Sequence, residues 1–150
     1  NPLVYQELNL EGDNSGYQLG AVATQLVGKF AASAGASYIR QLEKDNKVNF
    51  GIPFSNEAIL YNLSMGYLLF PRNYENYKQV NLNLYCEFLG QQSTDIRASY
   101  IDIAPAVQLI FNSSTRFNVG ARYQLAGNAH RMTERSVFIS LEHYFLNALK

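Results

Sequence analysis

The chain has 150 residues with 12 basic and 12 acidic side chains, so its formal net charge is zero. This length suits one domain, residues 1–150, and the charge balance excludes a global attraction to nucleic acid. Only 16% of the residues are charged, against roughly 25% in soluble domains, whereas 13% are aromatic. No apolar run reaches the length of a membrane-spanning helix, and no signal peptide opens the chain, so an exported form would already have lost one.

Apolar and polar residues alternate with period two along most of the chain, which predicts β-strands. The clearest example is KQVNLNLYCEFLG, where Leu82 and Leu84 alternate with Asn81 and Asn83. A helix would not separate the two kinds of residue in this way. In chain order, the alternation predicts eight strands, at residues 3–11, 17–26, 30–41, 58–70, 78–90, 97–111, 116–126 and 136–145.

The stretch SVFISLEHYFLNALK also fits a helix with Phe138, Leu141 and Phe145 on one face, but the seven preceding strands favour a strand as far as Phe145. Pro105 cannot donate a ladder hydrogen bond, so a bulge or bend is expected there. Long and short connections alternate, which is typical of an up-and-down meander with its long loops at one end. The long connection 42–57 carries four apolar residues, for which two roles are open: covering the end of the folded sheet or contacting a partner. They are Phe50, Ile52, Pro53 and Phe54.

Eight antiparallel strands can close into a barrel, and the polar phase of the alternation indicates which side faces water. The surface of a soluble barrel is usually rich in charged residues, whereas here the second phase is mostly Asn, Gln, Ser, Gly and Ala. In strand 30–41 this phase reads Ala31, Ser33, Gly35 and Ser37, and Phe30 and Tyr38 lie near the two ends of the other phase. We therefore predict an all-β fold, an eight-stranded antiparallel up-and-down transmembrane β-barrel, with a soluble lipocalin-like binder as the alternative.

A known family resembles this pattern. The segment IDIAPAVQLIFNSSTRFNVGARYQLAGNAHRMTERSVFISLEHYFLN, with its Ala-Pro strand, short polar turn, Gly-containing strand and terminal aromatic strand, resembles the C-terminal hairpins of Gram-negative, Bacteroidetes-type outer-membrane barrels of the transporter or phenol-degradation-pathway (MetA-like) family. Barrels of that family have more strands. The resemblance implies an outer-membrane location and passive transport of small solutes, with apolar ones among the candidates. The LNALK tail after Phe145 departs from the terminal aromatic of such barrels.

The polar phase also supplies the candidate site, a polar network in the lumen. Buried opposite charges in a narrow barrel tend to pair, since desolvating them singly is costly. Such a network either braces a non-conducting barrel or forms a constriction that selects a solute. Its predicted members are Glu87, Asp102, Arg122, Glu142, Asn83 and Asn118, with Asn81 and Gln108 nearby.

The sequence does not indicate a catalytic site, a cofactor-binding site or a metal site. His130 falls in a predicted loop and His143 on the lipid-facing phase, so neither has an evident nucleophile beside it. The single cysteine, Cys86, fits a small apolar position, and no nucleotide-binding motif is present. The expected partners are a lipid bilayer, and either a small solute or other membrane subunits. The predicted function is a transport or pore-type protein, with a non-conducting structural barrel or subunit as the alternative.

Overall fold

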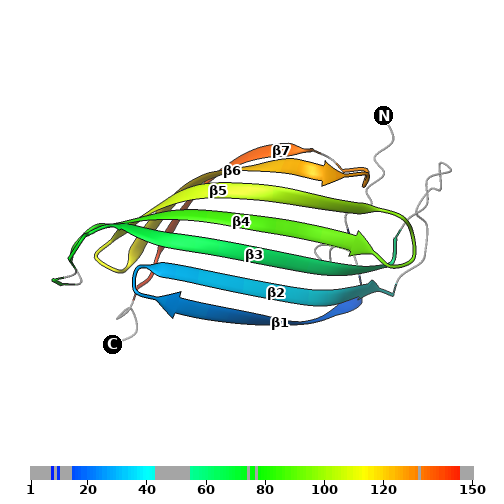
Figure 1. The fold of residues 1–150 in the computed structure, drawn as a ribbon, viewed down its shortest axis with the longest axis horizontal. Helices are drawn as coiled ribbons and strands as arrows, with labels where there is room; N and C mark the ends of the chain where they lie inside the picture. The colour runs from blue at the N-terminus through cyan, green and yellow to red at the C-terminus, as the bar shows by residue number, and fades with distance from the viewer. Residues whose placement is uncertain are drawn as a thin grey trace.

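A computed structural model describes residues 8, 10, 15–42, 55–73, 75–76, 78–131 and 133–145. These residues form a single antiparallel sheet in which each strand pairs with the next along the chain (Figure 1). The fold is therefore all-β, with an up-and-down order and no crossover connection. Its strands are β1 (Gly16–Val27), β2 (Phe30–Gln41), β3 (Glu57–Phe70), β4 (Asn81–Ser93), β5 (Ser99–Phe111), β6 (Thr115–Gly127) and β7 (Arg135–His143).

The register places the polar phase of every strand on one face of the sheet, because directly paired residues point to the same side. Ser33 pairs with Ser64, which pairs with Glu87, and Asn83 pairs with Gln108. This polar face also carries the most buried strand residues, among them Ile39, Ala58 and Asp102. We call it the inner face, and the opposite one the outer face.

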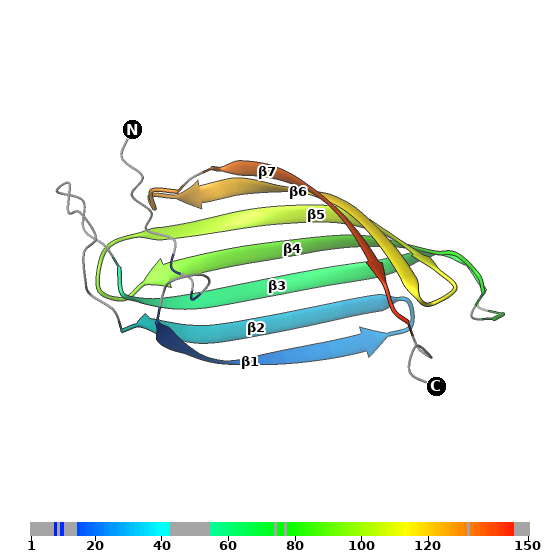
Figure 2. The ribbon, with the colours of Figure 1, turned by 180° about the vertical axis from the view of Figure 1, so that it is seen from behind.

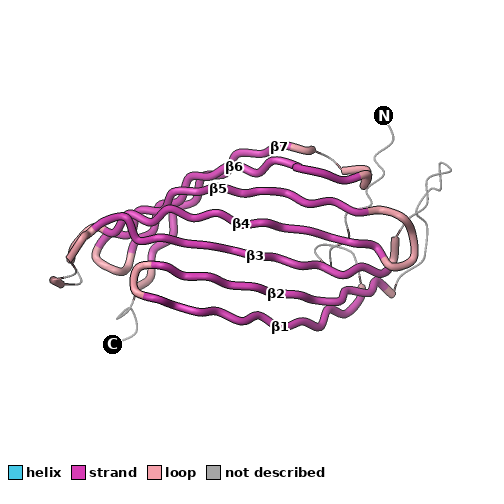
Figure 3. The backbone as a smooth tube through the Cα atoms, in the orientation of Figure 1, coloured by secondary structure: helices cyan, strands magenta, loops and turns pink. Residues whose placement is uncertain are grey.

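The sheet is strongly curved (Figures 1 and 2), and the inner face is its concave side, since inner-phase residues of both β1 and β7 line one cavity. The backbone trace shows long strands joined by short turns and loops (Figure 3). One cavity is lined both by the β1–β2 turn, at Gly28 and Lys29, and by β7, at Ser140 and Glu142. The two edges of the sheet therefore approach a common space although β1 and β7 are not paired within the described residues.

Seven of the eight predicted strands are confirmed, with bounds within three residues of the prediction. The described residues nevertheless do not close into a barrel, so an eight-stranded barrel is not what they form. The predicted strand 3–11 lies mostly outside the described residues, and its two described members, Leu8 and Leu10, are not in a strand. Leu8 instead packs on the inner face against Ile39 and Ala58. In an up-and-down order β1 and β7 run in the same direction, so they cannot pair with each other in antiparallel fashion.

Of the bulge or bend expected at Pro105, the bulge is absent. Pro105 pairs with Cys86 in unbroken register on the β4 side. On the β6 side the recorded pairs pass from Ile103–Tyr123 to Ala106–Gly120 with the same offset, so the ladder has a gap there without a shift. A missing N–H removes a bond and does not require an inserted residue. The irregularity of this strand pair lies between Ile101 and Asp102 instead.

The connections follow the predicted alternation only in part. Residues 28–29, 71–80 and 112–114 join strands at one end of the sheet, and residues 42–56, 94–98 and 128–134 join them at the other. The connection 71–80, expected to be short, is longer than 94–98. Phe50, Ile52, Pro53 and Phe54, expected to cover the barrel mouth, lie outside the described residues.

Candidate functional site: the polar inner face

The outer face consists of exposed apolar side chains along most of each strand. Leu63 is 46% exposed and Ile139 70%, although both lie within their strands. Polar outer residues occur near strand ends, as with Arg40 and Gln92. Burying one such side chain contributes about 1.5–3 kcal/mol, so a wetted face of this composition is costly. It comprises, among others, Leu19, Ile59, Leu63, Tyr67, Leu84, Ile101, Val107, Val119, Leu125, Val137, Ile139 and Leu141.

On the inner face, a ladder of amide side chains crosses four strands. Asn83 Nδ2 of β4 donates to Gln108 Oε1 of β5 at 3.1 Å, and Gln108 Nε2 donates to Asn118 Oδ1 of β6 at 2.8 Å. Asn118 Nδ2 then donates to Ser140 Oγ of β7 at 2.8 Å, and more weakly to Glu142 Oε1 at 3.4 Å. The ladder forms because the register places these residues opposite one another. We call Asn83, Gln108, Asn118 and Ser140 the amide ladder.

A buried carboxylate shared by two arginines lies nearer the end of the sheet that carries the connections 94–98 and 128–134. Asp102 of β5 has a side chain only 1% exposed and accepts from Arg122 Nε at 2.5 Å. Arg131 donates to both Asp102 oxygens, with Nη1 to Oδ1 at 2.8 Å and Nη2 to Oδ2 at 2.9 Å. This bidentate geometry is the strong form of a guanidinium–carboxylate pair.

Tyr100 and Gln124 complete this cluster. The Arg131 guanidinium carbon lies 3.9 Å from the centre of the Tyr100 ring, and Arg131 Nη1 donates to Gln124 Oε1 at 3.1 Å. The Arg131 side chain is 5% exposed, so this residue of the β6–β7 connection extends into the inner face. We call Asp102, Arg122, Arg131, Tyr100 and Gln124 the arginine cluster.

Glu87 and Glu142 are bound by neutral donors within the described residues. Asn62 Nδ2 donates to Glu87 Oε1 at 3.1 Å, and the Tyr85 hydroxyl donates to Glu87 Oε2 at 2.9 Å. Glu142 accepts from the Tyr144 hydroxyl at 3.2 Å. Each carboxylate oxygen has two lone pairs, so both groups keep further capacity to accept hydrogen bonds.

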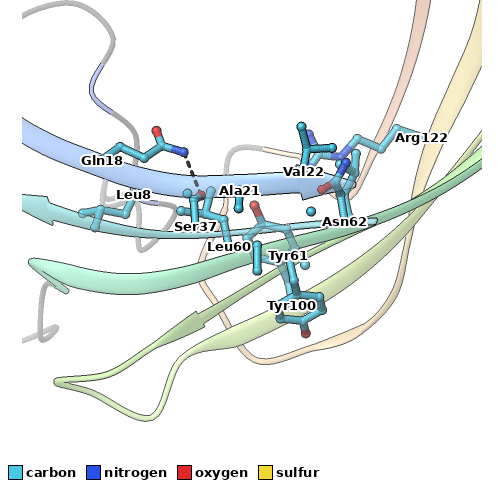
Figure 4. Close-up of a pocket in the computed structure, with 15 residues that line it drawn as sticks. Leu8, Gln18, Ala21, Val22, Ser37, Leu60, Tyr61, Asn62, Tyr100 and Arg122 are labelled. Atoms are coloured by element: carbon cyan, nitrogen blue, oxygen red, sulfur yellow. Dashed lines mark hydrogen bonds between the residues drawn. The ribbon is translucent and has the colours of Figure 1, made fainter. Parts of the chain in front are cut away.

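Two cavities lie along the inner face. The first, of about 740 Å³, is lined by Leu8, Gln18, Asn62, Tyr100 and Arg122, and Gln18 Nε2 donates to Ser37 Oγ beside it at 2.8 Å (Figure 4). The second, of about 890 Å³, contains the amide ladder together with Glu87 and Glu142. Arg122 and Leu89 line both cavities. The lining of each cavity combines polar side chains with apolar ones, such as Leu60 in the first and Leu68 and Ala104 in the second.

All six residues predicted for the polar network lie on the inner face, but they form separate groups. Asp102 and Arg122 pair, Asn83 and Asn118 belong to the amide ladder, Glu142 touches the end of that ladder, and Glu87 bonds to Asn62 and Tyr85. Arg131 was missed, because period-two alternation carries no information about a residue in a connection. Asn81, expected nearby, has a buried Oδ1 with no hydrogen-bond partner among the described residues.

Other chemical groups on the described residues are dispersed. His143 Nδ1 lies 2.7 Å from Thr115 Oγ1 near the end of β7, and Cys86 is a free thiol on the outer phase of β4. In the described parts of the chain, no three His, Cys, Asp or Glu side chains are grouped so as to hold a metal ion. Over the same residues, no helix has the length and apolar character to cross a membrane.

Comparisons with known proteins identify no relative. The sequence matches no protein-family model, no curated protein and no solved structure. The resemblance to outer-membrane transporters therefore stays a prediction, and the function has to be argued from the two faces of the sheet.

Proposed function

We propose that this chain is a pore-type transport protein of a bacterial outer membrane, its outer face in lipid and its inner face lining an aqueous lumen. The observation that carries the proposal is the division of the sheet: exposed apolar side chains on the convex side and hydrogen-bonded polar side chains on the concave side. In a soluble binder the apolar phase would face inward, away from water. In a membrane barrel it faces outward.

The proposal includes closure of the sheet into a barrel. A barrel removes the unpaired N–H and C=O groups at the edges of β1 and β7, which are not tolerated against hydrocarbon. Because β1 and β7 run in the same direction, an all-antiparallel closure needs an odd number of additional strands between them. A single additional strand gives the eight-stranded barrel that the sequence predicts.

Adjacent residues of β3 provide a direct test of transport. Gly66 lies on the inner face beside the larger cavity, and a Cβ there would approach only Leu84 O, at 3.9 Å. Met65 lies on the outer face. The Gly66→Phe variant should reduce the rate at which small sugars and amino acids swell proteoliposomes, because the ring fills the lumen. Met65→Phe should leave that rate unchanged.

Three outcomes would contradict the proposal. The membrane location is wrong if the protein folds and stays in the aqueous phase without detergent. Transport is wrong if the wild type inserts into liposomes but swells them no faster than protein-free controls. The assignment of faces is wrong if Met65→Phe, and not Gly66→Phe, reduces the swelling rate.

A non-conducting structural barrel is the second candidate, and the arginine cluster favours it. Two guanidinium groups and a fully buried carboxylate brace β5, β6 and the β6–β7 connection from the inside. Insertion into liposomes without any swelling would support this role.

A further inference from the structure

We propose that the larger cavity of the inner face binds an uncharged, hydroxyl-rich solute of the size of a mono- or disaccharide. The proposal names a solute class for the lumen and rests on the proposed function in one respect, that the inner face is open to water. The volume of this cavity, about 890 Å³, lies within the usual range for small-molecule sites.

The hydrogen-bonding groups of the cavity are mostly uncharged. Each amide of the ladder has two N–H groups and an oxygen with two lone pairs, and the bonds described above use only part of this capacity. A hydroxyl group can donate one hydrogen bond and accept others. The hydroxyl groups of a solute can therefore bond to the unused N–H groups and oxygens of the amide and serine side chains, which are spaced regularly from strand to strand. An apolar solute would leave the N–H groups and lone pairs that the ladder does not use without partners, which is penalised in a desolvated site.

The charges around the cavity favour a neutral solute. The described lining includes two cationic side chains, Lys29 and Arg122, and two anionic ones, Glu87 and Glu142. Arg122 also forms an ion pair with Asp102. No single sign dominates, so neither an anion nor a cation gains from the field as a whole. Glu87 and Glu142 are each bound by neutral donors and can accept from solute hydroxyls.

Aromatic rings provide the apolar surface that the C–H faces of a sugar need. Tyr85 and Phe138 belong to the inner phase and are 37% and 40% exposed, respectively. Phe138 lies over Gly120, where a Cβ would collide with its ring. The absence of a side chain at Gly120 thus allows the ring to lie close to the sheet beside the amide ladder.

Calorimetric titration of the folded protein in detergent tests this proposal without requiring transport. Glucose, glucosamine and glucuronate share the pyranose ring and differ in charge, so they serve as the probes. We expect glucose to bind more tightly than either charged analogue. Gln108→Met should weaken glucose binding by about tenfold, because it removes the central member of the ladder, which both accepts and donates.

The matched control is Gln92→Met, the same substitution on the neighbouring strand but on the outer phase, where Gln92 is exposed. It should bind glucose like the wild type. Phe138→Leu gives a second test that leaves the ladder intact, and it should also weaken binding.

Several results would overturn the proposal. These are no heat of binding for any of the three probes, tighter binding of glucosamine or glucuronate than of glucose, or equal effects of Gln108→Met and Gln92→Met. Failure of the proposed function is distinct, since it would appear as absent liposome swelling whether or not glucose binds in detergent.

Discussion

At the scale of single residues, Asp102 is the position of the inner face where a buried charge needs partners. Its carboxylate is fully buried and accepts hydrogen bonds from two arginines on different segments. Removing one member of a buried ionic group leaves the other charges uncompensated, which usually costs more than the pair itself contributes. Arg131, a residue of the β6–β7 connection, forms a bidentate ion pair with this carboxylate.

We expect Asp102→Ala to lower the free energy of unfolding by about 3–5 kcal/mol, because the buried guanidinium group of Arg131 and the partly exposed one of Arg122 lose their shared partner. Urea unfolding in detergent or in liposomes measures the change. Glu57→Ala is the matched control: its ion pair with Arg40, at 3.3 Å, has side chains that are 31% and 49% exposed. Solvent screens such a pair, so its loss should cost no more than about 1 kcal/mol. Equal losses for the two variants would show that Asp102 does not have this role.

At the scale of elements, the β5–β6 hairpin shows how a local conformation fixes a register. Asn112 and Ser113 both have positive φ, at 49° and 56°, and Ser114 N donates to Phe111 O at 3.1 Å. Positive φ at both central residues is a feature of type I′ turns, which favour Asn-Gly at the centre, although here the loop has three residues because Phe111 pairs with Thr115. The sequence has Asn-Ser, so Ser113 adopts a left-handed conformation that costs a residue with a Cβ about 1 kcal/mol.

Ser113→Gly should therefore stabilise the protein by about 1 kcal/mol, since glycine adopts positive φ without the steric cost. Chemical denaturation under the same conditions as for the wild type gives the difference. Ser114→Gly, one residue later and without positive φ, should be neutral or destabilising, because it only adds freedom to the unfolded chain. A stabilising Ser114→Gly together with a neutral Ser113→Gly would contradict this account of the turn.

The strands also show which structural features the alternation of apolar and polar residues predicts correctly. Strands β1 to β7 were predicted within three residues because alternation, turn residues and strand length agree for each of them. The bulge, one of the two alternatives at Pro105, is absent, because a residue that cannot donate weakens a ladder without changing its register. Leu8 was assigned to a strand because its neighbourhood alternates, yet it packs on the inner face against Ile39 and Ala58.

At the scale of the whole molecule, the main question is whether lipid or water contacts the outer face. Leu63 lies in the middle of β3 and Leu69 near its end, both on the outer phase and both exposed. In a bilayer, the cost of a charged side chain on the lipid face depends on depth, about 2–4 kcal/mol for arginine at the midplane and about 0–1 near the interface.

Leu63→Arg should accordingly destabilise the protein in liposomes by about 2–4 kcal/mol, and Leu69→Arg by no more than about 1 kcal/mol. Guanidinium unfolding from lipid vesicles measures both values. If water covers the outer face, neither substitution should cost much, and both should improve solubility without detergent. That result would contradict a lipid-facing outer face and with it the proposed membrane location.

The linear pattern was enough to establish the strands, their up-and-down order and the division of residues between two faces. These properties follow from period two and from turn chemistry, which are local and can be read along the chain. The grouping of Asp102 with Arg122 and Arg131, the course of the amide ladder and the open edges at β1 and β7 depend on register and curvature. Those features bring together residues that are distant in the chain, and a repeating alternation does not specify which of them meet.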